Sequence, residues 1–107
     1  MERYVVTTRL KPGAAPAAEE LLLAGPPFDP AGAGLSAHAA YLGGDRVFLV
    51  FEGDAAHAKA LALAKQYVVE VSRWEDLVWE LPAVVDDVPA DARCVYRWPA
   101  LARSRLE

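Results

Sequence analysis

Apolar residues fall into short runs along the chain, and the spacing within each run predicts the element that it forms. The run RYVVTTRL, residues 3–10, is rich in β-branched side chains, which favour a strand. Lys11-Pro12-Gly13 ends this strand, because proline removes a backbone donor and glycine favours a turn. Residues 14–24 then predict a helix, with Pro16 in its first turn and Leu21–Leu23 on its buried face.

The connection over residues 25–35, GPPFDPAGAGL, is rich in helix-breaking residues. Gly25 is expected to cap the preceding helix, and Pro26 and Pro27 prevent its continuation. Phe28 is the only large side chain in the connection. The segment is therefore either a lid with one aromatic anchor or a packed connector.

The stretch YLGGDRVFLVFEGD, residues 41–54, predicts a β-hairpin with strands over residues 36–42 and 46–52 joined by a glycine turn. Its second strand does not alternate, since every residue from Val47 to Phe51 is apolar. A strand with one face on the core would carry a polar residue at every second position. Both faces of this strand are therefore expected to be covered.

Asp54 is expected to cap a helix that runs to about Lys65. Valines in the next stretch favour a strand, but apolar residues recur at helical spacing, so a second helical segment is predicted over residues 67–80. Those residues are Tyr67, Val71, Trp74, Val78 and Leu81. Residues 82–91 then predict a loop.

Residues 92–98, ARCVYRW, predict the last strand. Its alternation places Cys94, Tyr96 and Trp98 on one side. The order of elements is strand, helix, strand, strand, helix pair, strand. This order predicts an α+β, ferredoxin-like fold: a four-stranded antiparallel sheet with its helices on one face. We expect a single domain over residues 1–107, with a core over about 3–98 and a tail over about 99–107.

The face of the sheet away from the helices would carry Phe48 and Val50, together with Tyr41. Such a patch is large for a monomer in water. A second copy packed against it around a two-fold axis would cover it. The sequence therefore predicts a homodimer with these three residues in its interface.

Charge and composition exclude several classes of partner. The formal net charge is −4 and the basic residues are dispersed, which argues against a nucleic-acid surface. No apolar run is long enough to span a bilayer, so no membrane partner is expected. Cys94 is the only cysteine, which rules out an internal disulfide and a cysteine-based metal site. A cytoplasmic location is the expectation from this cysteine content.

The chain resembles the dimeric α/β-barrel superfamily across about residues 3–98. The resemblance rests on RLKPG at the end of the first strand, on the hairpin YLGGDRVFLVFEGD with its acidic cap, and on a last strand that ends VYRW. Members include cofactor-independent antibiotic-biosynthesis monooxygenases and stress-responsive A/B-barrel proteins. The resemblance implies a dimer and, in its oxygenases, a substrate pocket between the sheet and the helices. These motifs are structural, so they do not assign a reaction.

His38 is the residue most suited to chemistry. A turn centred on Gly43-Gly44 pairs His38 with Leu49, and one centred on Gly44-Asp45 pairs it with Phe51. Either register places His38 on one face with these apolar residues. It is therefore either a buried, neutral imidazole without a chemical role or a catalytic base in a pocket. Phe28, Leu49, Phe51 and Trp74 are the candidate pocket residues.

His57 falls in the first turn of a helix and is expected at the surface. Two histidines without carboxylates at ligand spacing predict no metal site, and no cofactor motif is present. Three hypotheses follow. The leading one is a homodimer that binds a small apolar or aromatic molecule between sheet and helices. The others are a cofactor-independent monooxygenase with His38 as base, and a structural or regulatory dimer without a ligand. Whether the protein is an enzyme is left open.

Overall fold

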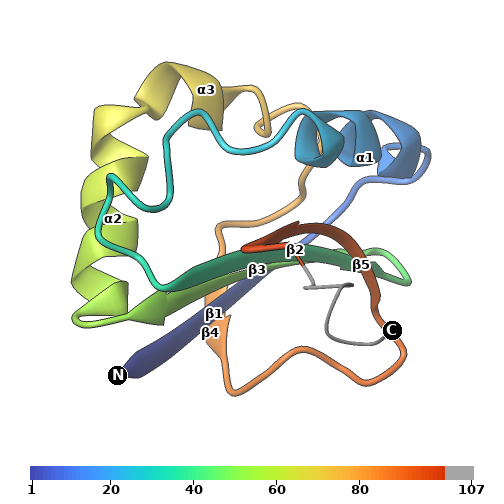
Figure 1. The fold of residues 1–107 in the computed structure, drawn as a ribbon. Coiled ribbons are helices and arrows are strands. Elements are labelled where there is room, and N and C mark those ends of the chain that lie inside the picture. The colour runs from blue at the N-terminus through green and yellow to red at the C-terminus, as the bar shows by residue number, and fades with distance from the viewer. Residues whose placement is uncertain (101–107) are drawn as a thin grey trace.

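The computed structural model describes residues 1–100 as an α+β fold with a five-stranded antiparallel sheet and three helices (Figure 1). The strand order across the sheet is β4-β1-β3-β2-β5. The strands are β1 (Glu2–Arg9), β2 (Ala37–Gly43), β3 (Arg46–Gly53), β4 (Ala83–Val85) and β5 (Arg93–Trp98). The helices are α1 (Ala15–Leu23), α2 (Ala56–Gln66) and α3 (Val68–Ser72). The predicted strands 3–10, 36–42, 46–52 and 92–98 and the helix 14–24 are confirmed to within two residues.

β3 lies at the centre of the sheet, between β1 and β2. Its hairpin with β2 turns at Gly44-Asp45, where Gly44 adopts a φ of 59° that side chains disfavour. This turn pairs His38 with Phe51, which selects the second of the two predicted registers. The side chains of β3 alternate between the two faces of the sheet, and both faces are apolar.

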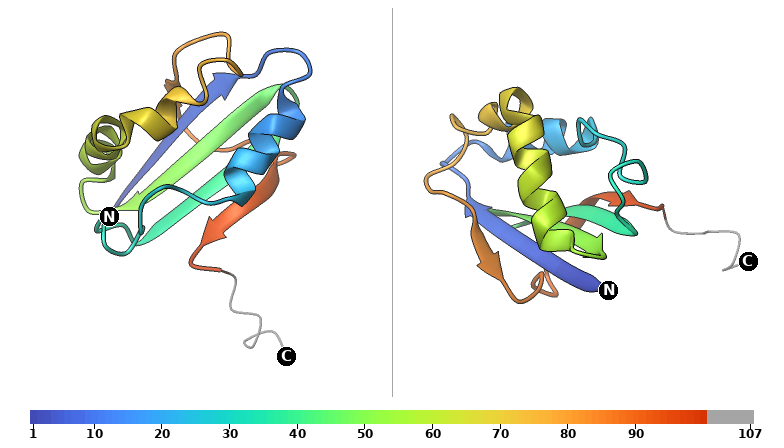
Figure 2. Two further views of the ribbon diagram at one scale, coloured as in Figure 1. Left: turned by 90° about the horizontal axis from the view of Figure 1, so that it is seen from above. Right: turned by 90° about the vertical axis from the view of Figure 1, so that its left-hand side faces the viewer.

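All three helices lie on one face of the sheet, as expected (Figures 1 and 2). α1 contacts β5, whereas α2 contacts β1 and β3, so the two groups of helices lie over opposite halves of the sheet. Small side chains are buried on the side of the helices that faces the sheet. Four alanines on the helices and at their starts are buried: Ala14, Ala18, Ala56 and Ala60.

The helical segment predicted over residues 67–80 is wrong beyond Ser72, where α3 ends. The chain turns back toward the sheet instead. Val78 forms a bridge to Leu10, and the Trp79 N–H donates to the Arg9 carbonyl at 2.9 Å. Trp74 still packs on the core from this turn. The apolar spacing therefore predicted burial only in part, because Val71 is 46% exposed and Leu81 is 88% exposed, and it did not predict the backbone conformation.

The expectation of four strands is also wrong, because the predicted loop 82–91 contains β4, which pairs with β1. The predicted last strand is β5, and it lies at the opposite edge beside β2. A register shift in this pair interrupts the alternation of β5. As a result, Cys94 lies opposite Tyr41, while Tyr96 lies opposite Ala40 on the other face.

The second face of the sheet is covered by the chain itself. Residues 86–92, here called the crossing segment, run beneath the sheet from β4 to β5 (Figure 1). Val85 and Val88 pack against a buried cluster on this face. The members of the cluster are Val5, Ala39 and Val50.

This cover corrects the premise of the predicted dimer interface. Phe48 is only 5% exposed and Val50 only 2% exposed within the single chain, and Tyr41 is half-buried. The large apolar patch expected on this face is therefore not present at the surface. The doubly apolar β3 is explained by helices on one side and by the crossing segment on the other.

The start of α2 differs from the predicted cap. Asp54 does not cap the helix; the N-cap position is Ala55, which has a positive φ of 53° and no capping side chain. A carboxylate from β1 takes over this role, because Glu2 Oε1 accepts the backbone N–H of His57 at 2.7 Å. The helix N-terminus is thereby tied to the first strand.

Within residues 1–100, no helix has both the length and the apolar character required to cross a membrane. The predicted tail over residues 99–107 lies mostly outside the part of the chain that the structure describes, which ends at Ala100.

Candidate functional site

His38 lies on β2 with its imidazole toward the helices, and it is 5% exposed. Three aromatic rings surround it. The ring centroid of Phe51 on β3 is 4.6 Å away, that of Phe28 in the connection is 5.4 Å away, and that of Tyr96 on β5 is 5.8 Å away. The imidazole is therefore enclosed by side chains from three different segments.

A backbone carbonyl fixes the orientation of the ring. His38 Nδ1 lies 2.8 Å from the carbonyl oxygen of Val50. A carbonyl oxygen can only accept, so Nδ1 carries the proton in this hydrogen bond. Burial lowers the pKa of His38, and the bond to Val50 opposes this effect only in part. At neutral pH the imidazole is therefore neutral, and Nε2 is left with a lone pair.

Phe28 covers His38 from the helix side and also packs against Tyr67 at a centroid distance of 6.0 Å. The connection that carries Phe28 is anchored by its neighbours. Leu35 is buried, and Lys59 Nζ on α2 donates to the Gly34 carbonyl at 2.9 Å. Phe28 itself is half-buried, so it forms the outer wall of the site.

Leu49 lies beside this group and is more exposed than its place on the central strand would predict. It faces the helices from the central strand, two residues from Phe51, and its pairing partners are Val6 and Ala40. A central position usually buries a leucine completely, yet Leu49 remains partly accessible. Within residues 1–100, the largest side chain that is completely buried is Val5, which lies on the opposite face.

The layer between the helices and the sheet therefore contains large side chains that each retain some accessible surface. Those that pack around Leu49 and Phe51 are Tyr4, Val6, Phe28, Leu63 and Trp98. Small residues are also buried in this layer, including Ala40 on β2 and Ala56 and Ala60 on α2. We call His38, Phe28, Leu49, Phe51 and Tyr96 the His38 site.

The predicted pocket residues are only partly brought together. Phe28 and Phe51 contact His38, and Leu49 adjoins them. Trp74 packs against the neighbouring cluster under α1, which includes Ala18 and Leu22; Leu49 and Tyr96 also pack against that cluster, but no contact between Trp74 and His38 is present. Tyr96 and the carbonyl of Val50 were not among the predicted site residues. Tyr96 becomes a neighbour of His38 only through the pairing of β5 with β2, which strand alternation cannot reveal.

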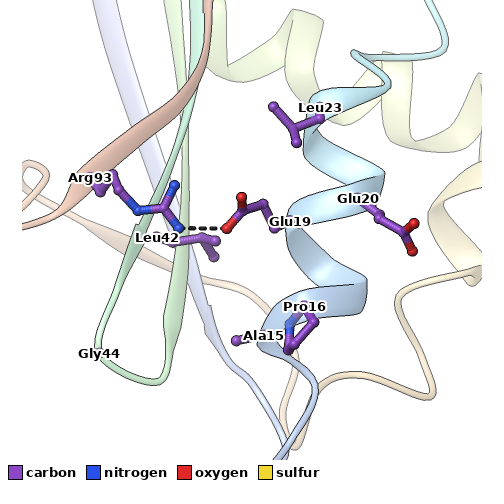
Figure 3. Close-up of a pocket in the computed structure, with 8 residues that line it drawn as sticks. All are labelled: Ala15, Pro16, Glu19, Glu20, Leu23, Leu42, Gly44 and Arg93. Carbon is purple, nitrogen blue, oxygen red and sulfur yellow. Dashed lines mark hydrogen bonds and ion pairs between the residues drawn. The ribbon is translucent and has the colours of Figure 1, made fainter.

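Two clefts lie elsewhere on the molecule. One, with a volume of about 490 Å³, separates α1 from the turn of the β2–β3 hairpin (Figure 3). An ion pair between Glu19 and Arg93, at 2.6 Å, lies across it. A smaller cleft of about 220 Å³ adjoins it and is bordered by Trp79. Neither cleft is lined by a residue of the His38 site.

The remaining candidates are placed as follows. His57 is exposed, as expected, and stacks on Tyr4 with ring centroids 4.3 Å apart. In the described part of the chain, no three histidine, cysteine, aspartate or glutamate side chains gather in a metal-binding arrangement.

The His38 site combines an apolar lining with one ring nitrogen that can accept a hydrogen bond or a proton.

No model of a known protein family matches this chain, and neither a curated protein nor a solved structure shows significant similarity to it.

Proposed function

We propose that this protein binds a small apolar or aromatic molecule between the helices and the sheet, over Leu49 and beside His38. The observation that carries the proposal is the partial exposure of Leu49 on the central strand, next to a buried histidine. A ligand that covered Leu49 would remove apolar surface from water, which is the main driving force for such binding.

The lining of the site supports the same class of ligand. Phe28, Phe51 and Tyr96 offer ring faces and edges, and aromatic pairs gain energy beyond simple burial. Burial raises the pKa of Tyr96 and lowers that of His38, so both side chains are neutral near pH 7. A neutral, flat molecule would meet no buried charge there.

Chemical-shift mapping tests the proposal. Naphthalene added to labelled protein should shift the resonances of Phe28, His38 and Leu49. Leu49→Trp should occupy the position proposed for the ligand. The naphthalene-induced shifts of Phe28 and His38 should then disappear. Leu23→Trp is the matched control, because Leu23 on α1 is 62% exposed, and it should leave binding unchanged. Unshifted resonances in the wild-type protein would contradict the proposal and favour a structural protein without a ligand.

A second candidate is a cofactor-independent monooxygenase in which His38 acts as base. The observation that favours it is the hydrogen bond to Val50, which leaves Nε2 unprotonated in an apolar setting. Dioxygen consumption with a bound hydroxyaromatic compound, lost in His38→Ala but kept in His57→Ala, would support this activity. Absence of consumption with every bound compound would leave a binding protein.

We further infer that β1, α1, β2, β3, the following helices and β4 form a ferredoxin-like core, to which β5 is added at the β2 edge. The strand order β4-β1-β3-β2 supports this inference. A relationship to the dimeric α/β-barrel proteins is part of the same proposal. The homodimer stays a prediction, and pairing through Phe48 and Val50 would require the crossing segment to move. A cytoplasmic location fits the free, exposed thiol of Cys94.

A further inference from the structure

We infer that the preferred ligand of the His38 site carries a hydrogen-bond donor, a hydroxyl or a ring N–H on an apolar body, which it directs at His38 Nε2. This inference rests on the proposed function and adds the class of ligand to it. It excludes both plain hydrocarbons and carboxylates as the best ligands.

The hydrogen bond to Val50 fixes which nitrogen of the His38 imidazole carries the proton. The Val50 carbonyl accepts from Nδ1 at 2.8 Å, and β3 holds this carbonyl in the centre of the sheet. The ring cannot flip to exchange its nitrogens without losing that bond. Nε2 is therefore the only atom of the imidazole that remains available, and it is available as an acceptor.

Solvent, and not a protein group, is the hydrogen-bond partner left to His38 Nε2. Among residues 1–100, no buried side-chain nitrogen or oxygen lacks a hydrogen-bond partner, and the hydrogen bond recorded for His38 is on Nδ1. Nε2 must therefore retain contact with solvent, although the residue is only 5% exposed. A ligand that displaced this solvent without a donor would leave the lone pair unpaired, and that loss is costly in an apolar setting.

The neutral state of His38 disfavours an anionic ligand. A carboxylate would require a protonated imidazole, but burial lowers the pKa of His38 and so favours the neutral ring. The rings that line the site, Phe28, Phe51 and Tyr96, provide no cation for an anionic ligand. The geometry thus favours neutral phenols, alcohols and indoles of modest size.

Three matched probes test this at pH 7.5: 2-naphthol, 2-methoxynaphthalene and naphthalene. They share one ring system and differ in the group at position 2, which is a hydroxyl, a methoxy group or a hydrogen; only the hydroxyl is a hydrogen-bond donor. We expect 2-naphthol to bind about tenfold more tightly than its methyl ether, as one hydrogen bond provides. In ¹⁵N spectra of histidine-labelled protein, 2-naphthol should shift the Nε2 resonance of His38, and the ether should not. His57 serves as the internal control.

The variant His38→Phe keeps an aromatic ring but removes both nitrogens. In this variant the three probes should bind with equal affinity. Equal binding of all three probes to the wild-type protein would overturn the inference and leave the proposed function standing. Binding of none of them would overturn both. A preference for 2-naphthol that persists in His38→Phe would place the acceptor elsewhere and would also overturn the inference. The wild-type ¹⁵N measurement decides the question even if His38→Phe does not fold.

Discussion

Arg3 Nη2 donates a hydrogen bond of 2.7 Å to Asp87 Oδ1, and so the first strand holds the start of the crossing segment. The same guanidinium also pairs with Glu52 on β3. The carboxylate of Asp87 accepts a second bond, from the backbone N–H of Val88 at 2.7 Å. Together these contacts lower the pKa of Asp87, with the bond to Arg3 as the largest cause. They place Val88 against the apolar second face of the sheet.

The first prediction concerns that covered face. Phe48→Asp should reduce the free energy of unfolding by about 3 kcal/mol or more, because it buries an unpaired carboxylate beneath the crossing segment. Leu81→Asp is the control: Leu81 is 88% exposed, and its effect should stay within about 0.5 kcal/mol. Urea denaturation at two protein concentrations measures both variants.

The two concentrations also separate the alternatives for Phe48. If it is buried within one chain, the urea midpoint of the wild-type protein should not depend on concentration. A midpoint that rises with concentration, together with a stable monomeric Phe48→Asp, would instead support the predicted homodimer.

The second prediction is that His38 stabilises the fold. His38→Ala removes the bond to Val50 and the contacts with three rings, and it should cost about 2–4 kcal/mol of stability. His57→Ala removes only an exposed stack on Tyr4 and should cost about 1 kcal/mol or less. Thermal and urea denaturation provide the comparison. Equal costs for the two variants would show that His38 is not packed as described.

The third prediction follows from the lowered pKa of His38. Between the folded-state pKa and the ordinary value of about 6.5, the unfolded chain binds a proton that the folded chain does not. The contribution of the neutral His38 to the free energy of unfolding should therefore be fully present above about pH 6.5 and should decline as the pH falls below it. His38→Ala should show a flatter profile between pH 7 and pH 5.

Other groups titrate in a separate range. The pKa values of Asp45 and Asp87 are lowered by their arginine partners, so their contributions disappear only at more acidic pH. Parallel profiles for the wild-type protein and His38→Ala between pH 7 and pH 5 would contradict the burial of a neutral imidazole.

The fourth prediction concerns the left-handed backbone at Ala55. A side chain at a φ of 53° is strained, so Ala55→Gly should raise stability by about 0.5–1 kcal/mol. Ala58→Gly is the matched control, because Ala58 is exposed inside α2, where glycine should lower stability by about 1 kcal/mol. Opposite signs in the two variants are the expected result, and a loss in both would contradict the strained conformation.

Local patterns predicted the first half of the fold well. The β-branched run of β1 and the glycine turn between β2 and β3 are properties of adjacent residues, which the chain reveals directly. The same is true of the proline at the start of α1. The parity of the hairpin also placed His38 on one face with Phe51 and Leu49, as the structure has it.

The second half depended on long-range contacts that no local pattern contains. β4 has only three residues between Pro82 and Asp86, and its pairing with β1 is what makes it a strand. Nothing within β5 indicates which edge of the sheet it joins, so the contact between Tyr96 and His38 could not be predicted. For the same reason, the apolar second face indicated a cover but not its source.

The crossing segment is anchored at both ends by edge strands. It joins opposite edges of the sheet, four strand spacings apart, which is roughly 19 Å at about 4.8 Å each. The eight Cα–Cα steps from Val85 to Arg93 can span at most roughly 29 Å when fully extended, so the segment can bow, but neither of its ends is free. The segment therefore cannot swing aside as a hinged flap would. For either end of this cover to be released, β4 or β5 must first separate from its neighbouring strand, so full access to the apolar face depends on the state of the two edges of the sheet.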